Sequence, residues 1–276
     1  MEQIAHDKDG EREAMEAGRM PLIEHLIELR RRLIYAFLGL VICWGFTYYY
    51  GNEIYEFLVR PLAKAMEGLP NQNPHLIYTA LTEAFMTRIK VSFWAACFLA
   101  FPLIASQVWL FVAPGLYTNE KSAFLPYLIA TPILFFLGGA LVYYLIFPQA
   151  WHFFLSFQTA GMPGSLPIEA DPKVSEYLSL VLTLIFAFGI AFEMPVGLTL
   201  LARVGLITSD FLRRNRRYAV VINFVAAAIL TPPDAISMCG LAVPLCLLYE
   251  ISIYTCRMVE KKRAADTASD VEPMAD

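Results

Sequence analysis

Charged residues and histidines are scarce in this sequence of 276 residues. Only 17% of the residues are Asp, Glu, Lys or Arg and four are His, while 58% are hydrophobic and the mean hydropathy is +0.53. Soluble chains carry about 25% charged residues, so water cannot be the main solvent of this one. The net charge is −4 and the acidic residues concentrate in the two tails, which argues against nucleic-acid binding.

The sequence also lacks the motifs of catalysis, metal binding and secretion. No GxSxG, HExxH, P-loop or GxGxxG pattern occurs, which argues against an enzyme. The five cysteines form no CxxC pair and have no His at ligand spacing, so we expect packing residues, with neither metal nor cofactor. The first 20 residues are polar, with no apolar stretch that ends in a cleavage site, so the first apolar run is expected to remain as a span.

Long apolar runs are abundant instead. A helix needs roughly 20 apolar residues to cross a hydrocarbon core of about 30 Å, and runs that are apolar on every face favour helices over barrel strands. The runs are residues 33–50, 91–113, 124–147, 177–202, 218–231 and 235–256. The last two are close to the minimum spanning length, which predicts local thinning of the bilayer. The sequence therefore predicts an all-α polytopic membrane protein with six transmembrane helices.

The distribution of Lys and Arg predicts the orientation of these helices. Of the 21 basic residues, 16 fall before the first run, between the second and third, between the fourth and fifth, and after the sixth. This bias places both termini in the cytoplasm. Residues 1–19 and 261–276 are charged and poor in apolar side chains, so we predict two disordered cytoplasmic tails around a membrane domain at 20–260.

Prolines are unusually frequent within the predicted helices. Each removes an intrahelical hydrogen bond and clashes with the preceding turn, although membrane helices often tolerate proline. The positions are Pro102, Pro126, Pro132, Pro195 and Pro244. We therefore expect kinked helices in a cupped bundle. In addition, the stretch EIYEFLVRPLAKAM at 53–66 has helical periodicity and is expected to lie on the outer surface.

Glu193 is an acidic residue deep within an apolar run. An ionisable side chain near the middle of a membrane costs roughly 2.5–3.5 kcal/mol. Such a carboxyl is protonated, pairs with a polar or cationic group, or faces a water-filled cavity. A structural helix–helix hydrogen bond is one interpretation, and a proton-carrying role in transport is another.

Three further residues have both a structural and a functional interpretation. Glu120 lies in the short loop between the second and third runs, where its carboxylate is either solvated or receives a guanidinium bidentately. Asp234 follows a Pro-Pro pair and can cap the sixth helix. His25 lies in an amphipathic lead-in to the first helix, and without a second His one turn away it favours a packing role over a metal site.

Four motifs, in order and spacing, resemble those of the TatC family, the signal-recognising core subunit of the twin-arginine protein translocase. They are HLIELRRRL (25–33), SQVWLFVAPGLYTNEK (106–121), AFGIAFEMPV (187–196) and LTPPD (230–234). The resemblance implies a glove-shaped, six-helix protein of the bacterial cytoplasmic membrane that self-associates in a larger complex. It also implies binding of the twin-arginine signal peptides of folded cargo, small single-span partners of the TatA and TatB type, and use of the proton-motive force.

The resemblance further implies which residues carry the function. Glu120 matches the loop residue that faces the two arginines, and Phe111 matches the aromatic just before that loop. Signal-peptide binding is predicted for Glu120, Phe111, Arg30, Gln107 and His25. A polar contact with a partner helix in the membrane is predicted for Glu193, Asp234, Thr231 and Pro61. Met238 stands where some family members carry Gln, which puts a polar partner contact there in doubt.

Two other classes of function remain as alternatives. The first is a proton-coupled small-solute transporter in which Glu193 carries the proton. Transporters usually contain paired repeats, and none is visible in this sequence. The second is an assembly scaffold, which would leave Glu120 without a role.

Overall fold

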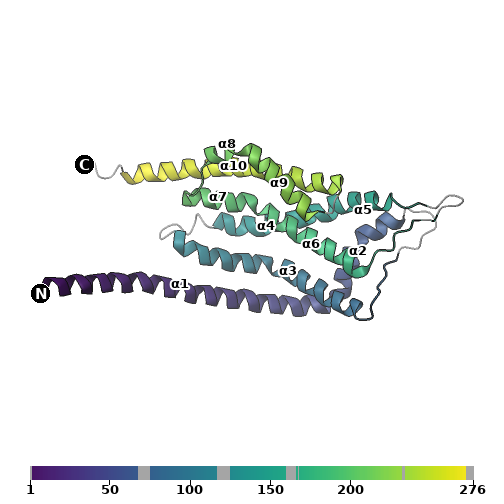
Figure 1. The fold of residues 1–276 in the computed structure, drawn as a ribbon, viewed down its shortest axis with the longest axis horizontal. Coiled ribbons are helices and arrows are strands. Elements are labelled where there is room, and N and C mark those ends of the chain that lie inside the picture. Colours follow the sequence, from purple (N-terminus) through teal and green to yellow (C-terminus); the bar gives the residue numbers. More distant parts are fainter. Residues whose placement is uncertain are drawn as a thin grey trace.

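The computed structural model describes the backbone of residues 2–67, 75–116, 125–159, 166, 168–231 and 234–271, and it leaves out the side chains of 2–22, 112–116, 125, 236 and 262–271. Long helices run roughly side by side along one axis (Figure 1), which confirms the predicted all-α class. The elements are α1 (Glu2–Tyr49), α2 (Gly51–Glu67), α3 (Glu83–Leu116), α4 (Leu125–Leu141), a π-helical turn (Val142–Ile146), α5 (Phe147–Leu155), α6 (Val174–Phe192), α7 (Met194–Val204), α8 (Ser209–Arg214), α9 (Arg216–Leu230) and α10 (Ala235–Val271).

The bundle has two distinct ends (Figure 1). The start of α1 and the end of α10 lie at one end, which we call the terminal end, and α2 lies at the other, the α2 end. The tail side chains up to residue 22 and from residue 262 lie outside the described residues. The predicted division into tails and a membrane domain at 20–260 therefore stays a prediction.

Four helical segments have the length and hydropathy to cross a membrane: Glu83–Phe111, Pro126–Leu155, Val174–Val204 and Ser237–Lys261. α1 and α2 pass the same test as a pair, bent by 76° between Tyr49 and Gly51. α9 has 15 residues, a rise of about 22 Å, which is short of a hydrocarbon core of about 30 Å. The count of six spans, the cytoplasmic termini and the local thinning therefore stay predictions.

Two prolines accompany interruptions of the α-helices. A turn at Glu193 separates α6 from α7, and Pro195 follows it, as the sequence predicts. Pro148 follows the π-helical turn, where its missing N–H and its ring prevent a regular α-helical bond to the carbonyl four residues earlier. The sequence prediction does not include this second interruption. The other predicted positions lie within α3, α4 and α10: Pro102, Pro126, Pro132 and Pro244.

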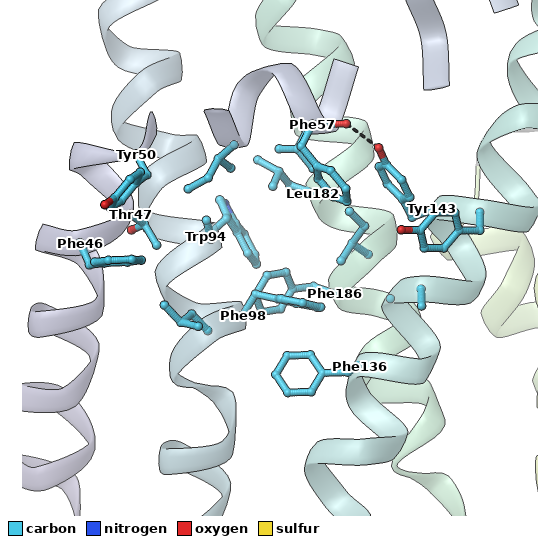
Figure 2. A pocket seen from close by; sticks show the side chains of 18 residues that line it. Phe46, Thr47, Tyr50, Phe57, Trp94, Phe98, Phe136, Tyr143, Leu182 and Phe186 are labelled. Atoms are coloured by element: carbon cyan, nitrogen blue, oxygen red, sulfur yellow. Dashed lines mark hydrogen bonds between the residues drawn. The ribbon is translucent and has the colours of Figure 1, made fainter. Parts of the chain in front are cut away.

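α2 is tied to the bundle through its own carbonyl groups. Pro61 lies inside this helix and has no N–H to offer the carbonyl of Phe57, four residues earlier. The hydroxyl of Tyr143 donates to that carbonyl at 2.6 Å (Figure 2). The hydroxyl of Tyr177 donates to the next carbonyl, that of Leu58, at 2.9 Å. The expected helix therefore forms, and side chains from the π-helical turn and α6 hold it, while its place on the outer surface stays a prediction.

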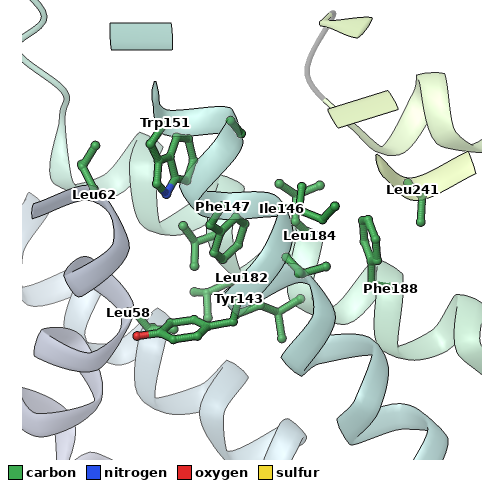
Figure 3. Packing of buried hydrophobic residues seen from close by; sticks show 14 of the residues in the cluster. Leu58, Leu62, Tyr143, Ile146, Phe147, Trp151, Leu182, Leu184, Phe188 and Leu241 are labelled. Atoms are coloured by element: carbon green, nitrogen blue, oxygen red, sulfur yellow. The ribbon is translucent and has the colours of Figure 1, made fainter. Parts of the chain in front are cut away.

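The largest buried cluster lies where α2, the π-helical turn, α5, α6 and α10 meet (Figure 3). Its labelled members are Leu58, Leu62, Tyr143, Ile146, Phe147, Trp151, Leu182, Leu184, Phe188 and Leu241. A second cluster joins α7, α8 and α10, and a third joins α3 to α7 through Ala105, Trp109 and Val196. Burial is therefore concentrated along α6, which contacts the elements on either side of it.

Glycines allow α4 and α6 to approach closely. A Cβ atom added to Gly138 would lie 2.6 Å from the backbone carbonyl oxygen of Phe188, and one added to Gly189 would lie 2.6 Å from the ring of Phe135. Small residues serve this purpose in membrane helices, because close backbone approach replaces the missing hydrophobic driving force. A backbone atom cannot move aside as a flexible side chain can, so Gly138 permits no larger residue without a shift of the helices.

We expect Gly138→Ala to lower the free energy of unfolding by about 1–3 kcal/mol, because the added methyl group overpacks the α4–α6 contact. Gly197→Ala is the matched control, since a Cβ atom there meets nothing within 4 Å. It should be neutral or stabilise by up to about 1 kcal/mol. Unfolding of the purified protein in detergent measures both, and equal effects would contradict the close approach.

Candidate functional site

Glu193 lies at the turn between α6 and α7, where its carboxyl faces the interior of the bundle. The side chain is partly buried and hydrogen-bonds with Thr131 of α4. Its Oε1 atom is buried and has no hydrogen-bond partner among the described residues. The buried Oε1 therefore retains the capacity to bind a further group.

Thr131 connects Glu193 to α3. The indole N–H of Trp109 donates to the Thr131 hydroxyl at 3.0 Å, and both side chains are buried. The Trp109 ring stacks on Tyr127, with centroids 5.7 Å apart, and the guanidinium of Arg203 lies 5.8 Å from the Tyr127 centroid. A continuous set of polar and aromatic contacts therefore runs from Glu193 to the last turn of α7.

Two of the predicted signal-peptide residues meet at the terminal end. The ring of His25 on α1 stacks on the ring of Phe111 on α3, with centroids 4.2 Å apart and an interplanar angle of 20°. Their positions belong to two motifs that are far apart in the sequence. The stack therefore joins the HLIELRRRL segment to the part of α3 that leads into the loop of Glu120.

The other predicted residues of this group are distributed differently. Glu120 lies outside the described residues. Arg30 is exposed on α1 and has no ion pair among the described residues, whereas Arg32, two residues later, pairs with Glu28 at 3.1 Å. Gln107 lies one turn before Phe111, and its buried Oε1 has no partner among the described residues. Arg30 and Gln107 therefore both retain free hydrogen-bonding capacity.

The hairpin between α9 and α10 contains the predicted Thr231 and Asp234, both buried. The Thr231 hydroxyl donates to the carbonyl of Ala227 at 2.8 Å. Asp234 Oδ2 accepts the backbone N–H of Ser237 at 2.6 Å, which confirms its predicted role as the cap of α10. Asp234 Oδ1 and Ser237 Oγ are buried without partners among the described residues. Capping therefore uses one carboxyl oxygen and leaves the other.

The structure does not place these residues in a single site. Pro61 lies in α2 at the far end of the bundle from the start of α1 (Figure 1), where it frees the Phe57 carbonyl for Tyr143. Glu193 belongs to the network with Thr131 and Trp109. The predicted residues therefore form a terminal-end group, an intramembrane group and two separate structural positions.

Four residues of the intramembrane network are absent from the sequence prediction: Trp109, Tyr127, Thr131 and Arg203. Trp109 lies within the motif at 106–121, and Thr131 is a hydroxyl residue inside an apolar run, so both carried a signal. Their contact with Glu193 required the packing of α3, α4 and α6. Among the residues that the structure describes, no group of three His, Cys, Asp or Glu side chains could hold a metal ion.

Comparisons with known proteins agree on one family. The family model described as Sec-independent protein translocase protein (TatC) matches residues 24–244. A TatC protein of Magnetococcus marinus is 49% identical over 91% of this chain and 89% of its own length. The TatC of Escherichia coli K12 is 36% identical over 86% of this chain and 88% of its own length.

The fold agrees with solved structures as well. A crystal structure of a twin-arginine translocase receptor, TatC, superposes with a TM-score of 0.70 at 37% sequence identity, and it covers 86% of this chain and 99% of the solved one. A second TatC crystal structure, in the detergent DDM, also gives a TM-score of 0.70 at 38% identity. The chain therefore belongs to the TatC family, and it is a multi-pass membrane protein of the Sec-independent protein translocase.

Proposed function

We propose that this translocase subunit is the receptor for the twin-arginine signal peptides of folded cargo. It acts in the bacterial cytoplasmic membrane, with both termini and the terminal end of the bundle in the cytoplasm. It works in a larger complex with single-span partners of the TatA and TatB type, driven by the proton-motive force, and catalyses no chemical reaction itself.

The observation that carries this proposal is the stack of His25 on Phe111. It joins two motif segments at the end of the bundle where the Lys- and Arg-rich segments favour the cytoplasm. A signal peptide that arrives from the cytoplasm would meet this surface first. The stack fixes the part of α1 around His25 against α3, next to the segment that leads to Glu120.

Glu120 supplies the charge that two arginines require. A carboxylate accepts a guanidinium through two parallel hydrogen bonds, which a neutral side chain cannot reproduce. The preceding Thr118 and Asn119 carry no charge, and the adjacent Lys121 is cationic. Gln107 and Arg30 offer further polar groups, which suit the backbone and the polar residues around the arginine pair.

Glu193 has a different role in this proposal. Its buried Oε1 and the two buried oxygens at Asp234 and Ser237 need donors, and lipid provides none. A polar side chain on the membrane helix of a partner could satisfy Glu193, and the same reasoning applies at Asp234. The comparisons do not support the alternative of a proton-coupled small-solute transporter, so we do not propose it.

Glu120→Gln should reduce crosslinking of a twin-arginine signal peptide by about tenfold or more and block export of its cargo, because charged hydrogen bonds are worth roughly 1.5–3 kcal/mol. Glu56→Gln is the matched control, since Glu56 is exposed on α2, at the end of the bundle opposite the terminal end. It should leave crosslinking unchanged. Full binding by the Glu120 variant would refute its role as the arginine partner.

Phe111→Ala should weaken signal-peptide crosslinking several-fold, since an aromatic pair contributes about 0.5–1.5 kcal/mol. Phe111→Tyr keeps a ring and should bind nearly as the wild type does. In a double-mutant cycle, His25→Ala should add little once Phe111 is already alanine, because the two changes remove the same contact. Strictly additive losses would show that the two rings act independently.

Glu193→Ala should weaken crosslinks between this protein and a single-span partner by about fivefold or more, while signal-peptide crosslinking stays close to that of the wild type. Thr131→Val should reproduce part of this loss, because it removes the hydroxyl that positions the carboxyl. Glu56→Ala serves again as the exposed control. Loss of signal-peptide binding before loss of partner contact would overturn this division of roles.

A further inference from the structure

A large apolar cavity lies at the α2 end of the bundle, between α1, α2, α3, α4 and α6. Its volume is about 430 Å³, within the range of roughly 300–1,000 Å³ typical of ligand pockets. Figure 2 shows the side chains of Trp94, Phe98, Phe136 and Phe186 around this space, with Phe57 and Tyr143 at the side where α2 crosses it. A space with such walls holds no stable water, because a buried water needs two to four polar partners.

A second cavity, of about 320 Å³, continues the first along the groove between α3 and α6. Trp94 and Leu182 line both cavities, so the two spaces share a wall. The second cavity is more polar than the first: its lining residues include Lys90 and four residues with hydroxyl groups, Thr87, Ser175, Ser179 and Thr183. The Ser175 hydroxyl donates to Glu83 Oε1 at 2.6 Å. Lys90 has no ion pair among the described residues. A cation and several hydroxyls therefore face a space that directly adjoins an apolar one.

The two cavities together follow the polarity of one leaflet of a bilayer. From Lys90 to Leu99, which lines the deep part of the apolar cavity, α3 rises about 13 Å. This is close to half of a hydrocarbon core of about 30 Å. The polar part lies toward the first turn of α3 and the apolar part toward its middle, as a headgroup and an acyl chain do.

We propose that this composite groove binds one phospholipid of the leaflet at the α2 end. The phosphate lies against Lys90 and the hydroxyl of Ser179, and one acyl chain fills the aromatic cavity beneath Trp94. Charge complementarity favours this occupant, because Lys90 is exposed beside the groove without an ion pair among the described residues, and its ammonium attracts an anion. An apolar peptide helix would fill the deep cavity but would offer that ammonium no anion.

The bound lipid would stabilise the packing of the helices at the α2 end of the bundle. The acyl chain would contact α1, α2, α3 and α4 at once, because residues of all four line the cavity. Each contact adds a small dispersion energy, and together they would hold these helices against one another.

Native mass spectrometry of the purified, delipidated full chain tests the proposal. Phosphatidylglycerol is titrated against diacylglycerol with the same acyl chains, which lacks the phosphate. Lys90→Gln should weaken phosphatidylglycerol binding about tenfold, to the level of diacylglycerol. Lys64→Gln, at an exposed lysine in the last turn of α2, is the matched control and should stay within twofold of the wild type. Equal affinity of Lys90→Gln and the wild type would overturn the headgroup assignment.

Ala140→Phe tests the acyl-chain cavity, because the added ring would occupy the space that Ala140 lines. The substitution should weaken the binding of both phosphatidylglycerol and diacylglycerol at least tenfold. Circular dichroism checks that the variant still folds. A second measurement leaves Ala140 unchanged and uses phosphatidylglycerol that is brominated on its acyl chains. Bromine quenches tryptophan fluorescence on contact, so this lipid should quench the fluorescence of the wild type more strongly than that of Trp94→Phe. Equal quenching would overturn the proposal. A synthetic apolar helical peptide that binds the wild type but not Ala140→Phe, while lipid binds both equally, would assign the cavity to a peptide instead.

Discussion

Polar groups within the apolar helices of this protein need partners supplied by protein, because hydrocarbon offers none. Several buried hydroxyls meet this constraint locally, as Ser252 does by donating to the carbonyl of Leu248 at 2.6 Å. Others meet it between helices: Thr47 on α1 donates to the carbonyl of Ser92 on α3 at 2.7 Å. Tyr143 donates to the carbonyl that Pro61 frees. The same bonds that satisfy the backbone therefore hold α1 against α3, and α2 against the π-helical turn.

Length and hydropathy predict much of this fold, because the runs that must cross a membrane are visible as runs. The break at Glu193 and the cap at Asp234 also follow from local chemistry, namely a nearby proline and a carboxylate that precedes a helix. Helix boundaries are less predictable. α3 begins at Glu83, ahead of the apolar run that starts at residue 91, because Glu83 accepts bonds from the backbone N–H of Thr79 at 2.9 Å and the hydroxyl of Ser175 at 2.6 Å.

The candidate sites are harder to predict, because they depend on which helices become neighbours. Nothing in the spacing of Trp109 and Thr131 indicates that they share a hydrogen bond, and the motif containing His25 does not identify Phe111 as its neighbour. Once the helices are packed, α3 connects three of these sites. It carries Lys90 and Trp94 toward the α2 end, and Trp109 and Phe111 toward the terminal end. A displacement of α3 would therefore reach the lipid groove, the intramembrane network and the receptor surface together.

The π-helical turn at Val142–Ile146 rotates the side chains that follow it about the helix axis. One additional residue in a turn rotates everything that follows by about 100° relative to a regular helix. Without it, the buried face that runs through Thr131, Phe135 and Gly138 would continue toward Gln149 and His152. With it, Phe147 and Trp151 point into the core, and Gln149 and His152 stay exposed. Pro148 thus accompanies a rotation that lets one long hydrophobic segment bury one face before the π-helical turn and a differently oriented face after it.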